Sequence, residues 1–142
     1  MVVDLVLRLL LAAALGAVIG FEREWHQKPA GLRTNILIAL GAALFTIVST
    51  ALASQGSADR IVAQVVTGIG FLGGGAILRD RQHIHGLTSA ATIWVNAAIG
   101  IAAGAGMFAL AAAATLLTLV VLAILAPLER YFEGRSKDTR KA

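Results

Sequence analysis

The stretch MFALAAAATLLTLVVLAILAPL, residues 107–128, contains no charged side chain. A helix of this length rises about 33 Å, which is enough to cross a hydrocarbon core of about 30 Å. Four further apolar runs precede it, so five transmembrane helices are predicted, at Leu5–Phe21, Thr34–Leu52, Ile61–Leu78, Leu87–Ala105 and Met107–Leu128. The predicted fold class is all-α, a polytopic membrane helix bundle.

Composition supports a membrane protein. Of the 142 residues, 58% are hydrophobic and 14% are charged, against about 45–50% and about 25% in soluble domains. Residues 1–128 are predicted to form one transmembrane domain, followed by a short basic tail at 129–142. The basic residues lie in short clusters between apolar runs, which argues against nucleic-acid binding. The absence of cysteine excludes disulfides, thiolate zinc sites and cysteine nucleophiles.

Positive charges are concentrated on one side of the predicted membrane. The first loop, the third loop and the tail carry ten basic residues, namely Arg23, Lys28, Arg33, Arg79, Arg81, Arg130, Arg135, Lys137, Arg140 and Lys141. The opposite side carries Arg8 and Arg60. Because cytoplasmic loops are enriched in Lys and Arg, we predict an outside N-terminus and a cytoplasmic C-terminus. Asp4 precedes Arg8, which disfavours a cleaved signal peptide.

Glycines fall in two patterns. The hexapeptide Gly68-Ile69-Gly70-Phe71-Leu72-Gly73 matches G-x-G-x-x-G, but it lies inside an apolar run, which disfavours a dinucleotide-binding turn. Close helix packing is the favoured interpretation, and a broken helix lining a polar cavity is the alternative. Two GxxxG pairs also predict packing faces, within one chain or in a homodimer: Gly16 with Gly20, and Gly100 with Gly104.

The most charged stretch lies between the first two runs. Glu22 and Glu24 would point about 200° apart on a helix, so they cannot chelate one ion together. A solvated ion-pair cluster is favoured over a partner-binding or ion-binding site. Adjacent helical residues do not face each other, so Arg33 or Arg79, in preference to Arg23, is expected to pair with Glu22.

Polar residues inside the predicted spans are further candidates. Asn96 lies near the middle of the fourth run and is expected to face protein. An interhelical hydrogen bond is favoured for it over a role as a substrate ligand. The same interpretation applies to Gln64 and Thr67. His83 and His85 lack the additional ligands of a metal site, so a solvated loop is favoured there.

No acidic residue falls at the centre of a predicted span. Proton relays and many cation carriers place ionisable groups there, and Mg²⁺ prefers carboxylates and water. A pathway for Mg²⁺ lined by carboxylates is therefore disfavoured. We expect no cofactor, and the sequence leaves open whether any metal is bound.

Four motifs occur in a fixed order: G-x-E-R, A-G-L-R-T, G-I-G-F-L-G and G-L-T-x-A-A-x-x-W. They lie in the three segments Gly16–Phe45, Arg60–Asp80 and His85–Gly106, which together span the interval 16–106, about two-thirds of the chain. This combination resembles the MgtC/SapB family of bacterial inner-membrane proteins. The residues that match its motifs are Glu22, Arg23, Gly31, Leu32, Arg33, Thr34, Gly68, Gly70, Gly73, Gly86, Leu87 and Thr88.

The resemblance implies a non-enzymatic, multi-pass inner-membrane protein linked to adaptation to low magnesium and, in pathogens, to virulence. It also implies a regulator that binds other membrane proteins, with ATP synthase as a proposed partner. Long members of the family carry a soluble C-terminal domain, whereas this sequence ends after a basic tail, so a short form is expected. Gly74 and Ser89 stand where alanine and threonine are expected.

Two functions are therefore compared. The leading hypothesis is a membrane regulator acting through helix contacts with a partner, and the alternative is a channel or transporter for Mg²⁺ or another cation. An enzyme is disfavoured because no nucleophile and base pair is visible. The candidate partner-binding or ion-binding residues are Glu22, Arg23, Arg33, Thr34, Gln64, Thr67, Arg79, Thr88 and Asn96.

Overall fold

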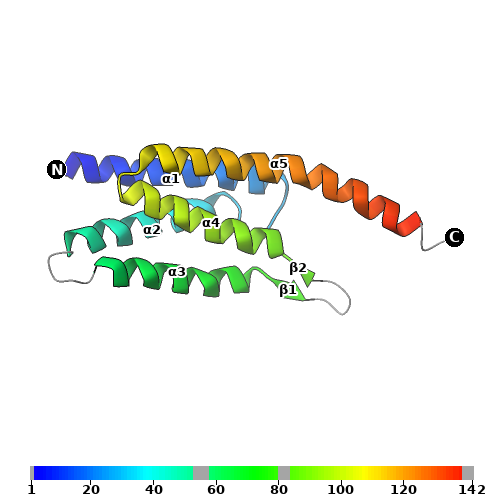
Figure 1. Cartoon of the computed structure of the whole chain (residues 1–142), viewed down its shortest axis with the longest axis horizontal. Helices are drawn as coiled ribbons and strands as arrows, with labels where there is room; N and C mark the ends of the chain where they lie inside the picture. The colour runs from blue at the N-terminus through cyan, green and yellow to red at the C-terminus, as the bar shows by residue number, and fades with distance from the viewer. Residues whose placement is uncertain (1, 53–57, 80–83, 139–142) are drawn as a thin grey trace.

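The computed structural model describes residues 2–52, 58–79 and 84–138, with the side chains of 58, 59, 78, 79 and 126–138 excepted. Within these residues, the all-α prediction is confirmed by five helices: α1 (Val2–Trp25), α2 (Leu32–Ala51), α3 (Ala58–Gly75), α4 (Leu87–Gly104) and α5 (Phe108–Asp138). Successive helices run in opposite directions along one elongated bundle (Figure 1). The end where α1 stops and α2 starts is called the turn end below.

In the described part of the chain, four helices are long and apolar enough to cross a membrane, one fewer than the five spans predicted: α1, α2, α4 and the Phe108–Leu125 part of α5. The apolar part of α3, Arg60–Gly75, is shorter than the predicted span Ile61–Leu78. Its 16 residues rise about 24 Å, less than a hydrocarbon core of about 30 Å. Three consecutive glycines end it, because each costs about 1 kcal/mol in a helix.

A short strand pair follows α3 and was not predicted. β1 (Leu78–Arg79) and β2 (Ile84–His85) run antiparallel, with Leu78 opposite His85. Gly86 then adopts φ +88° and precedes the first residue of α4. A side chain on Gly86 would overlap the backbone carbonyl of Ala76, so glycine is required where the chain enters α4.

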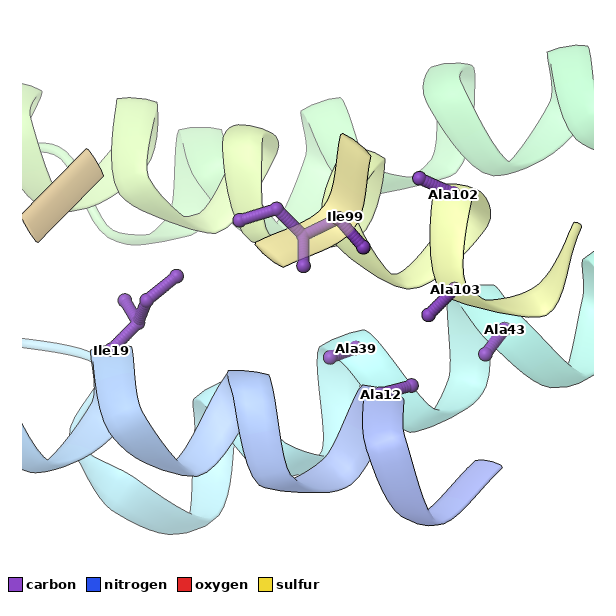
Figure 2. Close-up of a cluster of buried hydrophobic side chains, with 8 residues drawn as sticks. Ala12, Ile19, Ala39, Ala43, Ile99, Ala102 and Ala103 are labelled. Carbon is purple, nitrogen blue, oxygen red and sulfur yellow. The ribbon is translucent and has the colours of Figure 1, made fainter. Parts of the chain in front are cut away.

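The core is built mainly from alanine. Helix α4 contacts each of the other four helices, and α1 packs on α2. Ala12, Ala39, Ala43 and Ala103 lie where α1, α2 and α4 meet (Figure 2). Small side chains at these positions let the helix backbones approach closely, which is how helices associate where lipid removes the hydrophobic driving force.

Candidate functional site

Two buried amides join α2 to α4. The side chains of Asn35 and Asn96 are fully buried. Nδ2 of Asn96 donates to the backbone carbonyl of Asn35 at 2.7 Å and to its side-chain Oδ1 at 3.1 Å. Oδ1 of Asn96 is buried without a hydrogen-bond donor among the described residues. Asn96 therefore faces protein and contacts a residue that the sequence analysis did not single out.

Asn35 also holds the turn between α1 and α2. Its Nδ2 donates to the carbonyl oxygens of Ala30 and Gly31. Gln27 and Ala30 have left-handed backbone conformations, with φ of 52° and 60°. Such conformations cost about 1 kcal/mol or more for non-glycine residues, so bonds from a buried side chain help to fix the turn. The central amide pair is thereby connected to the charged turn end.

The carboxylate of Glu24 caps α2. Its Oε2 accepts a hydrogen bond from the backbone N–H of Leu32 at 2.8 Å. The N-cap residue of α2 is Gly31, which has no capping side chain of its own. A Cβ on Gly31 would overlap the Glu24 carboxylate, so glycine leaves room for this group. A negative charge at a helix N-terminus also interacts favourably with the helix dipole.

Glu22 pairs with two residues close to it in sequence. Its Oε2 lies 3.6 Å from Nη1 of Arg23, and its Oε1 lies 3.0 Å from Nδ1 of His26. The Arg23 side chain is 5% exposed and the Glu22 side chain is 16% exposed. Oε2 of Glu22 and Nε of Arg23 are buried without hydrogen-bond partners in the described part of the chain. The pair is thus partly desolvated and incompletely satisfied.

The expectation that Arg33 would pair with Glu22 is wrong. Arg33 is exposed on α2, and Arg23 takes that place despite its adjacent position. Arg23 lies one turn beyond Ile19 and Gly20 and two turns beyond Gly16, on the buried face of α1. The side chain of Arg79, the other expected partner, lies outside the described residues.

Both GxxxG pairs pack on α2 within one chain. A Cβ on Gly16 would lie 2.6 Å from the carbonyl oxygen of Asn35, and one on Gly20 would lie 2.8 Å from Cα of Leu32. Gly100 and Gly104 make equally close approaches from α4, to the backbones of Ala39 and Ala43. These distances exclude any side chain without movement of the α2 backbone.

The glycines of α3 behave differently. A Cβ on Gly73 would make ordinary contact with Ala90, at 3.5 Å from its carbonyl oxygen. A Cβ on Gly68 or Gly70 would meet open space, with no atom within 4 Å. The close packing expected at Gly68 and Gly70 is therefore not made inside the described chain. Because α3 is continuous from Ala58 to Gly75, a broken helix at Gly70 is not observed either.

The remaining candidates lie at the surface of the bundle. Thr34 and Thr88 are exposed near the turn end. Gln64 and Thr67 are exposed on α3, where the Thr67 hydroxyl donates to the carbonyl of Ala63. His85 is exposed in β2, whereas His83 lies outside the described residues. The structure does not bring these side chains together with Asn96.

Sequence reasoning missed three residues that organise the bundle. Asn35 and Glu24 act as described above. At the opposite end, Nη1 of Arg8 donates to the carbonyl of Gly104 at 3.0 Å, and Arg8 pairs with Asp4 at 2.9 Å. A cation at the C-terminus of α4 is favoured by the helix dipole. Two features of the sequence could have identified these residues. Asn35 is an amide within an apolar run, and Arg8 forms an i, i+4 charge pair with Asp4.

The chemistry available at the turn end is hydrogen bonding and charge pairing. Among the described residues, no group of three or more His, Cys, Asp or Glu side chains is arranged to hold a metal ion. Glu22 and Glu24 point to different partners, in agreement with their spacing. The arrangement supports a polar seam that joins α1, α2 and α4.

Comparison with known proteins places the chain in a defined group. Residues 9–131 match the MgtC family. Protein MgtC of Salmonella typhimurium is 53% identical over 114 residues, which are 80% of this chain and 49% of that protein. Protein MgtC of Brucella abortus is 46% identical over 122 residues, 86% of this chain and 51% of that protein. An uncharacterized protein of Synechocystis is 48% identical over 125 residues, 88% of this chain and 53% of that protein.

The chain therefore spans about half the length of the curated relatives that it matches. No solved structure gives a significant match.

Proposed function

Because the chain belongs to the MgtC family, we propose that it is a non-enzymatic regulator of the bacterial inner membrane, linked to adaptation to low magnesium. It acts by binding other membrane proteins through its helices. ATP synthase is the partner class that family resemblance suggests. The segment 1–128 is the part that enters the membrane, with the C-terminal tail in the cytoplasm.

One observation carries this proposal: the polar side chains inside the bundle donate hydrogen bonds to other groups of the protein, either across two helices or within one helix. Asn96 bonds to Asn35, and the hydroxyls of Thr46, Thr92 and Thr115 each donate to a carbonyl of their own helix. A path for a dehydrated cation needs ligands that replace water. Side chains that already donate to protein carbonyls are suited to stabilising the fold and are poorly placed to replace the water of a cation.

The placement of acidic groups agrees with this function. The acidic side chains that the structure describes are Asp4, Glu22 and Glu24, all near the ends of α1. Cation carriers commonly place a carboxylate near the bilayer centre. Mg²⁺ in particular prefers carboxylates together with water.

A cation channel is the second candidate, and one feature of α3 favours it. Gln64 and Thr67 are exposed, and neighbouring Gly68 and Gly70 are uncovered. In an assembly of several chains, these groups would offer polar atoms to a path between α3 helices. The GxxxG pairs of α1 and α4 are filled by α2, so a homodimer would have to form through a different face.

Site-specific photocrosslinking in living cells tests the regulator. A photoreactive residue replaces one exposed side chain on each outer helix: Leu10 on α1, Phe71 on α3 or Leu117 on α5. The proposal expects at least one position to give an adduct of fixed size with a different membrane protein, and buried Ile99 to give none. Adducts only between copies of this chain, or none at any position, would reject it.

A further inference from the structure

A groove of about 1040 Å³ lies between α2 and α3, and neither Asn35 nor Asn96 lines it. Its walls are mainly apolar, with Leu37 and Phe45 on α2 and Ile69 and Leu72 on α3. Helix α3 lies on the outside of the bundle, next to α2 and α4 (Figure 1). The groove is thus placed where lipid surrounds the helices.

Two glycines give the groove its width. Gly41 of α2 and Gly68 of α3 line it, and a Cβ on either would have no atom within 4 Å. A space between helices in a bilayer cannot stay empty without loss of dispersion contacts along its walls. Something apolar and slender must fill it.

Polar groups occur in a definite order along α3. Arg60 lies in the first turns of α3, is exposed and lines the groove. Its guanidinium makes no ion pair with a side chain that the structure describes, and the side chain of the neighbouring Asp59 lies outside those residues. Gln64 also lines the groove, one turn further along the same face. Beyond Gln64, the α3 wall is formed by apolar residues and Gly68.

This order matches the chemistry of a phospholipid. A phosphate suits the guanidinium of Arg60, an ester carbonyl suits the amide of Gln64 and an acyl chain suits the apolar wall. The length agrees as well. From Arg60 to Leu72 the helix rises about 18 Å, close to the depth of one leaflet, which is half of a core of about 30 Å.

We propose that the groove between α2 and α3 is a binding site for one anionic phospholipid, with its phosphate on Arg60 and an acyl chain against Gly41 and Gly68. A second copy of the chain fits less well. A partner helix would cover the apolar walls of the groove, whereas a phospholipid would cover these walls and also bring an anion to Arg60.

Native mass spectrometry of the full chain in mild detergent tests this site, with dioleoylphosphatidylglycerol and dioleoylphosphatidylcholine as probes. The wild type is expected to retain one phosphatidylglycerol in preference to phosphatidylcholine. Gly68→Leu fills the groove and is expected to weaken retention at least tenfold. Arg60→Gln is expected to lower the preference for the anionic lipid about fivefold, the effect of one basic residue near a lipid headgroup.

The matched control is Gly70→Leu. Gly70 lies on the same helix and is equally uncovered, but it does not line the groove, so this variant is expected to retain the lipid as the wild type does. Equal loss of lipid in Gly68→Leu and Gly70→Leu would overturn the site. So would an unchanged lipid preference in Arg60→Gln, or a lipid-free dimer that Gly68→Leu converts to a monomer, which would make a second copy the occupant.

Discussion

Nδ2 of Asn96 donates to both oxygen atoms of Asn35, at 2.7 Å for the backbone carbonyl and 3.1 Å for the side chain. The two residues are separated by 61 positions in the sequence and are both fully buried. The Nδ2 of Asn35 in turn donates hydrogen bonds to the backbone carbonyls of Ala30 and Gly31. One amide pair thus connects α4, α2 and the turn that precedes α2.

The first prediction concerns this pair. Asn96→Ala is expected to lower the free energy of unfolding by about 1–2 kcal/mol, since hydrogen bonds between membrane helices average about 0.6 kcal/mol and reach about 1.7. Asn35→Ala is expected to cost more, because it also releases the turn. A double-mutant cycle, measured by unfolding in mixed micelles, should give a coupling above about 0.5 kcal/mol. Additive losses would show that the two amides act independently.

The second prediction separates two kinds of glycine. Gly100→Ala places a methyl group against the backbone of Ala39 and is expected to cost about 1–3 kcal/mol through overpacking. Gly70→Ala enters open space and is expected to stabilise the helix by about 0.5–1 kcal/mol. Thermal unfolding in detergent measures both variants. A destabilised Gly70→Ala with an unaffected Gly100→Ala would contradict the observed packing.

The third prediction concerns the charges at the end of α1. Glu22→Gln leaves the buried Arg23 without its counter-charge and is expected to destabilise the fold by about 1–3 kcal/mol. A cycle with Arg23→Gln should show coupling. The matched control is a cycle with Arg33→Gln, which should be additive within about 0.5 kcal/mol because Arg33 is exposed. If Glu22 coupled to Arg33 and not to Arg23, the pairing of Glu22 with Arg33 that was expected from the sequence would be supported instead.

The sequence contained enough information for the helices. Each apolar run appears as a helix, because a backbone in lipid must satisfy its hydrogen bonds internally. The end of α3 was placed three residues too late, since hydropathy does not register the low helix propensity of Gly73-Gly74-Gly75. The low helix propensity of these glycines therefore ended α3 before the apolar run ended.

The candidate site was less predictable, for two physical reasons. The partner of Asn96 is set by how α2 packs on α4, and no local pattern encodes a contact across 61 positions. The pairing of Glu22 with Arg23 depends on which face of α1 is buried. Spacing rules for an exposed helix direct adjacent side chains apart, but burial leaves a long arginine few directions in which to extend.

The fourth prediction is the orientation in the membrane. Because ten of the twelve basic residues fall on one predicted side, the C-terminus is expected in the cytoplasm. A C-terminal green fluorescent protein fusion should fluoresce, and a C-terminal alkaline phosphatase fusion should be inactive. The reverse pattern would place the Glu22–Arg23 pair at the periplasmic face.

The proposed function makes one central claim, that the polar side chains inside this bundle stabilise its fold and do not conduct cations. The most direct measurement is Mg²⁺ entry into proteoliposomes loaded with a magnesium-sensitive dye, with an ionophore added last to show that the dye responds. The expected trace for the wild type equals that of protein-free liposomes. Entry that rises with the protein-to-lipid ratio, and that Gln64→Ala or Asn96→Ala abolishes while the protein stays folded, would contradict the claim and establish a cation pathway.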